Sequence, residues 1–161
     1  MPKALIPGTY DPITLGHVDV IERASRIFTE VVVAVAASPQ KGSGPLFCLE
    51  ERVGFAEEAV AHLPNATVRS FDSLLVSFAR DTGVDTIVKG LRAVTDFESE
   101  FQQASINYQL NPDLETMFIM ANPRHMYLSS SMVKEIAAMG GDVSHWVTAI
   151  VQQELSLRLG N

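Results

Sequence analysis

The sequence predicts an α/β fold in which five parallel strands form a doubly wound sheet within a single domain. Two observations lead to this prediction. Short apolar runs rich in β-branched residues alternate along the chain with longer segments whose apolar residues recur at helical spacing. The chain is also 161 residues long, with 47% hydrophobic and 19% charged residues, which suits one globular domain spanning residues 1–161.

Each predicted element rests on its own pattern. Apolar and often β-branched residues mark five strands, at residues 3–6, 31–36, 66–70, 86–88 and 116–120. Apolar stripes with a helical period mark six helices, at residues 17–28, 49–63, 74–81, 96–110, 131–139 and about 148–159. Because helices and strands alternate, we expect a Rossmann-like parallel sheet, with ligands outside the carboxyl ends of its strands.

Composition and charge exclude several classes of protein. The longest apolar stretch, residues 31–37, is far too short to cross a bilayer, so we expect no membrane insertion. A net charge of −7 argues against a general nucleic-acid surface, which needs clustered Lys and Arg. The first four residues lack the apolar core of a secretory signal, and Cys48 is the single cysteine. Both features favour the cytoplasm.

The loop at residues 7–17 is the first candidate for a ligand site. It follows a predicted strand, contains Gly8, and places Thr14 and His17 at or near the start of a helix. The unpaired N–H groups and positive dipole end of a helix N-terminus attract anions. An ordinary βα turn is the alternative interpretation of the same spacing.

Three of the five loops that follow predicted strands carry at least one Lys or Arg. Lys41, Lys89 and Arg92 would converge over one edge of the sheet in an otherwise acidic protein, which indicates a polyphosphate ligand. Taken singly, each could equally be a solvated surface residue.

Two further predicted helix starts lead to different interpretations, one as an anion site and one as a structural cap. Residues 129–131 offer three Ser hydroxyls where one would cap the helix, and Lys134 opposes the helix dipole, so we expect an external anion there. Lys134 pointing into water is the alternative. Thr95 and Glu98, by contrast, match a structural capping box, with Glu100 on a solvated face by default.

The familiar catalytic patterns are absent from the sequence. It contains no Walker loop, dinucleotide-binding turn, zinc-protease motif, C-x-x-C pair or nucleophile elbow, and its histidines have no metal-ligand spacing. Phosphate-binding residues without an obvious general base suit a reaction whose nucleophile is itself a phosphate, because its second pKa is near about 6. Catalysis would then depend on in-line positioning and charge stabilisation.

Three short motifs in the sequence resemble those of a known family. T-x-G-H at residues 14–17, K-G-L-R at 89–92 and S-S-S-x-x-K at 129–134 resemble the nucleotidyltransferase superfamily, more narrowly the bacterial phosphopantetheine adenylyltransferases. The likeness runs nearly the whole length, through P-G-T-Y-D-P-I-T-L-G-H, A-A-S-P-Q-K, L-E-E-R-V and G-L-R-A-V-T-D-F-E. It implies Mg²⁺-dependent, reversible adenylyl transfer from ATP to 4'-phosphopantetheine. The products would be dephospho-coenzyme A and pyrophosphate, in the penultimate step of coenzyme A biosynthesis by a homohexamer.

The resemblance also implies roles for individual residues. His17 would stabilise the pentacovalent transition state, and Thr9 would contact both substrates. ATP would be bound by Thr9, Tyr10 (through the loop backbone), His17, Gly90, Leu91, Arg92, Glu100, His125, Met126, Tyr127, Leu128, Ser129, Ser130 and Ser131. The acceptor would be bound by Thr9, Lys41, Leu75 and Lys89. No Mg²⁺ ligand is predicted.

The sequence departs from the family pattern in three places. Lys89 stands where many relatives have Arg, residues 42–45 form a longer and more flexible loop, and Leu75 and Met126 occupy variable positions. Rival interpretations are a transferase with nicotinate mononucleotide or glycerol 3-phosphate as acceptor, a non-catalytic nucleotide-binding module, and a structural oligomer scaffold. Thr14 disfavours the nicotinate enzymes, which usually carry His there.

Overall fold

One parallel sheet organises the part of the chain that the computed structural model describes, residues 2–37 and 44–160. Its strands are β1 Lys3–Gly8, β2 Glu30–Ala36, β3 Ala66–Phe71, β4 Thr86–Leu91 and β5 Glu115–Met120. Every neighbouring pair is parallel, and the order across the sheet is β3-β2-β1-β4-β5. The chain therefore winds outward from β1 in both directions, which confirms the predicted α/β class and the doubly wound sheet.

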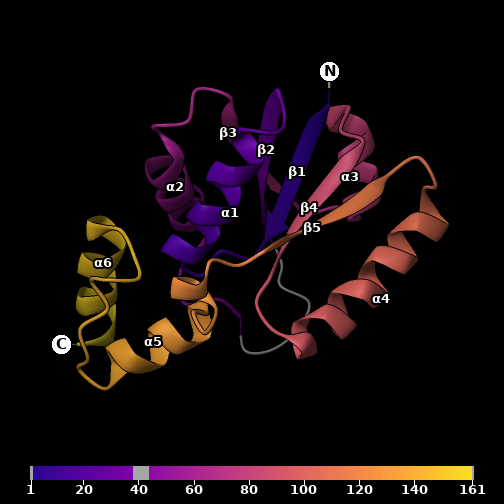
Figure 1. Cartoon of the computed structure of the whole chain (residues 1–161). Coiled ribbons are helices and arrows are strands. Elements are labelled where there is room, and N and C mark those ends of the chain that lie inside the picture. The colour runs from indigo at the N-terminus through magenta and orange to yellow at the C-terminus, as the bar shows by residue number, and fades with distance from the viewer. Residues whose placement is uncertain (1, 38–43, 161) are drawn as a thin grey trace.

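The described residues form six α-helices, of which the first four each connect one strand to the next and the last two follow β5. They are α1 Leu15–Ser25, α2 Leu49–Val60, α3 Leu75–Thr82, α4 Val94–Leu110, α5 Ser130–Ala138 and α6 Ala149–Leu159, and a 3₁₀ turn, η1 Pro123–His125, was not predicted. Figure 1 shows α1 and α2 on one side of the sheet and α3 and α4 on the other, with α5 and α6 next to each other. No helix of the described residues is long and apolar enough to cross a membrane.

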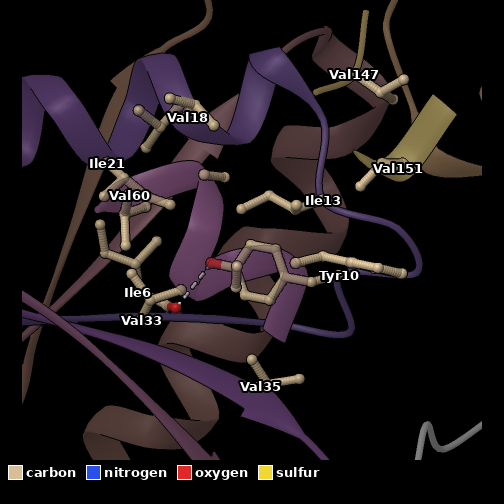
Figure 2. Packing of buried hydrophobic residues seen from close by; sticks show 14 of the residues in the cluster. Ile6, Tyr10, Ile13, Val18, Ile21, Val33, Val35, Val60, Val147 and Val151 are labelled. Atoms are coloured by element: carbon tan, nitrogen blue, oxygen red, sulfur yellow. Dashed lines mark hydrogen bonds between the residues drawn. The ribbon is translucent and has the colours of Figure 1, made fainter. Parts of the chain in front are cut away.

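Both faces of the sheet are buried at its centre, as the period-two pattern of β2 illustrates. Val31, Val33 and Val35 belong to the larger hydrophobic cluster, whereas Val32 and Ala34 belong to the smaller cluster with α3. Figure 2 shows the larger cluster, in which strand residues pack against α1 and against the loop after β1. Side chains of this loop, Tyr10 and Ile13, are therefore part of the core.

The two halves of the sheet meet along a short ladder. β1 pairs with β2 from Lys3 to Gly8, but it pairs with β4 only at Ala4 and Leu5. The carboxyl halves of β1 and β4 are therefore not hydrogen-bonded to each other. A ligand site is expected at this position, where the winding direction of the sheet changes.

Helix α4 corrects the prediction of a capping box at Thr95. The helix begins at Val94 with Ala93 at the N-cap, and the carbonyl of Ala93 accepts from the amides of Asp96 and Phe97. Because the backbone closes the first turn earlier, Thr95 lies inside the helix. None of the α4 side chains that the structure describes is buried, so the predicted apolar stripe of this helix faces outward.

Candidate active site

A cavity of about 330 Å³ lies where β1 and β4 separate. The end of β1, the loop that follows it and the start of α1 contribute Gly8, Tyr10, Thr14 and His17 to its lining. The end of β4 and helix α4 contribute Lys89, Gly90, Arg92 and Glu100. The segment that enters α5 contributes His125, Leu128, Ser129, Ser130 and Ser131. Three regions far apart in the sequence thus meet around one space, as the Rossmann-like topology predicts.

His17 is held in one tautomer by the start of α1. Thr14 is the N-cap, and its side-chain oxygen accepts from the His17 backbone N–H at 3.4 Å. In return, the Thr14 backbone N–H donates to Nδ1 of His17 at 2.9 Å. A backbone amide can only donate, so Nδ1 carries no proton and the neutral ring is protonated on Nε2.

The charge state of His17 follows from its surroundings. Burial, assisted by the positive charges of Arg92 and Lys89, lowers the pKa of His17 to about 4. The ring is therefore neutral at pH 7. It offers an N–H donor to the cavity that it lines, without adding a charge.

Tyr10 supports His17 from the core side. Its ring is almost fully buried and packs edge-on against the His17 ring, with 5.0 Å between centroids. Its hydroxyl donates to the carbonyl of Ile6 at 2.9 Å, the bond drawn in Figure 2. A Cβ on Gly8 would lie only 3.0 Å from this ring, so the close approach requires glycine there. With its side chain turned into the core, Tyr10 has only its backbone for a ligand.

The backbone of Tyr10 is itself unusual, because its φ is +50°, in the left-handed region. A non-glycine residue held there costs about 1–3 kcal/mol and persists only where its surroundings over-determine it. Burial, the hydroxyl bond and the contact with His17 supply that constraint. Burial also raises the pKa of the Tyr10 phenol, so the hydroxyl remains a donor.

Asp11 corrects the interpretation of Lys134 as a sign of an external anion. Nζ of Lys134 donates to the Asp11 carboxylate at 2.7 Å, so the cation already has a partner. Asp11 is buried and also accepts from the backbone amides of Leu46 and Phe47, each at 2.9 Å. Burial alone would raise the pKa of Asp11, but the bonds from Lys134, Phe47 and Leu46 outweigh it and lower that pKa.

The three serines at the start of α5 make different contacts. Ser129 is the N-cap and accepts from the amide of Met132 at 3.1 Å. The hydroxyl of Ser130 donates to the carbonyl of Pro12 at 2.7 Å, which ties α5 to the loop after β1. Ser131 lines the cavity in the first turn of the helix. The helix start thus faces the cavity, as an anion site requires, independently of Lys134.

Lys89, Arg92 and Glu100 form the opposite wall. Nζ of Lys89 lies 3.2 Å from Glu100 Oε2, and both side chains are about three-quarters buried. Glu100 therefore faces the cavity, and the default solvated position expected for it is wrong. Arg92 donates to the carbonyl of Leu128 at 2.7 Å and to Asp96 at 3.1 Å. Its guanidinium is thus fixed between α4 and the segment that enters α5.

His125 offers an open hydrogen-bonding atom. Its Nδ1 is buried and has no hydrogen-bond partner among the described residues, although the side chain lines the cavity. A buried polar atom without a partner costs free energy, so a ligand group bound here would recover it.

Several predicted site residues do not line this cavity. Leu75 packs with Phe71 and Phe78 in the smaller core cluster, and the side chain of Tyr127 is 82% exposed. Thr9, Leu91 and Met126 flank lining residues without lining the cavity themselves. Lys41 and residues 42 and 43 of the predicted long loop lie outside the described residues.

Sequence reasoning missed two buried charged residues, Asp11 and Arg52. A signal was present for Arg52, because it shares a helical stripe with Phe55, Ala56 and Ala59, all of which are buried. A guanidinium on an apolar stripe must find internal partners. Asp11 gave no comparable signal, since an aspartate before a proline is ordinary in a turn.

Comparisons with known proteins agree with this geometry. A family profile described as cytidylyltransferase-like matches residues 5–136, which include every residue that lines the cavity. The chain is 52% identical over 157 residues to the phosphopantetheine adenylyltransferase of Thioalkalivibrio sulfidiphilus (strain HL-EbGR7), with 98% of each chain covered. Its fold is similar to that of a protein from Vibrio parahaemolyticus provisionally named nicotinate-nucleotide adenylyltransferase. There the TM-score is 0.68 at 20% identity, over 96% of this chain and 99% of the other.

Proposed function

Because the chain belongs to the cytidylyltransferase-like family and, within it, to the phosphopantetheine adenylyltransferases, we propose that it transfers an adenylyl group from ATP to 4'-phosphopantetheine. The reaction is reversible, yields dephospho-coenzyme A and pyrophosphate, and is the penultimate step of coenzyme A biosynthesis. The observation that carries the proposal is a neutral His17 donor that shares one cavity with Lys89, Arg92 and the start of α5.

The chemistry needs no general base from the protein. The terminal phosphate of 4'-phosphopantetheine is largely dianionic at pH 7, because its second pKa is about 6. One of its oxygens attacks the α-phosphorus of ATP, a new O–P bond forms, and the bond to pyrophosphate breaks. Nε2–H of His17 donates to an oxygen on that phosphorus as negative charge grows there, which stabilises the transition state more than the ground state.

The nucleotide is assigned to the α4 and α5 side of the cavity. The start of α5, with Ser129, Ser130 and Ser131, receives phosphate oxygens, and Arg92 adds a fixed positive charge. The remaining ATP contacts follow the family resemblance. They are Thr9, the Tyr10 backbone, His17, Gly90, Leu91, Glu100, His125, Met126, Tyr127 and Leu128.

The phosphate of the acceptor is assigned to Lys89, in the carboxyl half of β4. Lys89 lines the cavity, and its ion pair with Glu100 leaves further donors of the ammonium group to bind phosphate. Thr9, Lys41 and Leu75 complete the acceptor site by family resemblance alone. Because Leu75 packs in the smaller core cluster, its contact with the pantetheine arm is the first to test by substitution.

We further propose that Mg²⁺ enters as part of the ATP substrate. The described residues contain no group of three or more His, Cys, Asp or Glu side chains that could hold a metal ion. Mg²⁺ commonly keeps several waters and binds through substrate phosphates, which fits a cavity without a carboxylate cage. The magnesium requirement then belongs to the nucleotide.

The chain is also proposed to assemble with copies of itself, as a homohexamer by family resemblance, and to act in the cytoplasm. What supports assembly is α4, whose large apolar side chains are exposed. They are Phe97, Phe101, Ile106, Tyr108 and Leu110. Exposed apolar groups gathered on one helix favour burial in an interface.

Pyrophosphate release from ATP and Mg²⁺ tests the function directly. We expect turnover with 4'-phosphopantetheine and at most trace turnover with nicotinate mononucleotide or glycerol 3-phosphate. Omitting the acceptor is the control for simple ATP hydrolysis. Turnover with one of the other acceptors, and none with 4'-phosphopantetheine, would overturn the substrate assignment while leaving the reaction class in place.

A further inference from the structure

Arg52 of α2 is a buried cation whose partners are all carbonyl groups. The residue is 1% exposed. Its Nε donates to the carbonyl of Phe47 at 3.1 Å, and Nη1 donates to the carbonyls of Thr9 at 2.8 Å and Ala36 at 2.7 Å. Nη2 donates to the carbonyl of Ala37 at 3.2 Å. Within the described residues, no carboxylate lies within ion-pair distance of it.

This arrangement joins three separate segments at one point. Thr9 lies in the loop after β1, Ala36 and Ala37 lie at and just beyond the end of β2, and Phe47 precedes α2. A buried charge is costly unless its donors are satisfied, and the rigid fork of five N–H donors in a guanidinium can serve four carbonyls at once. The geometry of the three segments is therefore coupled to this one residue.

The segment before α2 is held from both sides. The amide of Phe47 donates to Asp11, and the carbonyl of the same residue accepts from Arg52. Asp11 and Thr9 belong to the loop that carries Tyr10, whose ring contacts His17 at 5.0 Å between centroids. A shift of Thr9 would therefore reach His17 through a single intervening residue.

We propose that Arg52 is a positioning residue for adenylyl transfer, fixing the loop of Thr9, Tyr10 and Asp11 against the end of β2. The proposal rests on the proposed function. Arg52 itself is not among the residues that line the cavity. It acts on the loop after β1, where Thr9 is assigned to both substrates and the backbone of Tyr10 to ATP.

The test compares Arg52→Lys with the wild type in steady-state pyrophosphate release. Lysine keeps the charge but cannot form the fork, so kcat should fall about 10- to 100-fold, as for a displaced catalytic group. KM for 4'-phosphopantetheine and KM for ATP should both rise several-fold, because Thr9 in the displaced loop is assigned to both substrates. Loss of stability alone would lower the active fraction and leave both KM values unchanged.

Val60→Ala is the matched control, because Val60 is buried on the same helix but bonds to none of the three segments. It should lower the melting temperature without moving either KM. If Arg52→Lys does not fold, Arg52→Gln, which buries no charge, takes its place with the same expected rise in both KM values.

An unchanged acceptor KM and kcat in the folded Arg52 variant, or the same changes in Val60→Ala, would overturn the positioning role. Failure of the proposed function has a different signature, because the wild type itself would then release no pyrophosphate with 4'-phosphopantetheine.

Discussion

The two walls of the cavity are built differently. On the β1 side, the strand pairs with β2 along six residues, and the following loop is fixed by core packing, a capping box and buried hydrogen bonds. On the β4 side, pairing with β1 covers two residues, and α4 covers the sheet without burying any of its described side chains. The first wall can hold a side chain in a fixed orientation, while the second places Lys89, Arg92 and Glu100 along the cavity and leaves apolar side chains of α4 exposed.

The largest expected effect comes from the β1 wall. Replacing His17 by Ala should lower kcat by about 100- to 1,000-fold, because it removes a donor that acts mainly on the transition state. The affinity for ATP should change much less. Steady-state kinetics with equilibrium ATP binding separates the two, and a near-normal kcat would contradict the role given to His17.

The second effect concerns the stability of the same wall. Asp11→Asn should lower the free energy of unfolding by about 1–3 kcal/mol, because Lys134 loses its carboxylate and one buried amide loses an acceptor. Urea denaturation measures it. Lys3→Gln, which breaks the exposed Lys3–Glu30 pair, is the control and should change stability by about 0.5 kcal/mol or less. Equal losses of unfolding free energy in the two variants would contradict a stabilising role for the buried Asp11 carboxylate.

A third effect is a pH dependence of stability. The pKa of His17 is lowered in the folded state to about 4, against about 6.5 when unfolded, so the unfolded chain binds more protons between these values. Stability should therefore fall as pH drops from about 6.5 to about 4. Urea midpoints at pH 7, 5.5 and 4.5 should fall less in His17→Gln than in the wild type, and parallel slopes would contradict the shift.

The smallest effect on the monomer belongs to the β4 side. Phe101→Ser on α4 should change the free energy of unfolding of the isolated chain by only about 0.5 kcal/mol, because the side chain is exposed. It should nevertheless lower the mass measured by light scattering. Ile27→Ser, an equally exposed apolar residue after α1, should leave that mass unchanged. If neither variant changes the mass, α4 is not the assembly surface.

Much of this contrast could be predicted from the sequence, and the reasons differ by residue. Alternating apolar periods predicted the strands and helices. Gly8, Thr14 and His17 in one loop predicted a ligand site, and the motifs at residues 14–17, 89–92 and 129–134 together carried the resemblance to the family. Local pattern could not reveal the Asp11–Lys134 pair, whose members are 123 residues apart. Nor could it fix which way Glu100 faces, or that Leu75 packs in the core, because both depend on how α3 and α4 settle on the sheet.

The same limit explains the errors at helix ends. The Thr95 capping box is a valid local pattern, but the hydrogen bonds to Ala93 and the Arg92–Asp96 pair start α4 earlier. At Thr14 the pattern held in an altered form, since His17 fills the position where Glu or Gln is usual in a capping box. This exception to the usual capping box is the residue proposed to stabilise the transition state.

The most direct test of the account is the protonation state of His17 at pH 7, read from the ring-nitrogen chemical shifts of histidine-labelled protein, with His17→Gln to assign the signals. The geometry predicts a neutral ring with the proton on Nε2 and none on Nδ1. A protonated imidazolium, or a proton on Nδ1, would contradict the claim that the β1 wall presents a fixed, uncharged donor to the reacting phosphate.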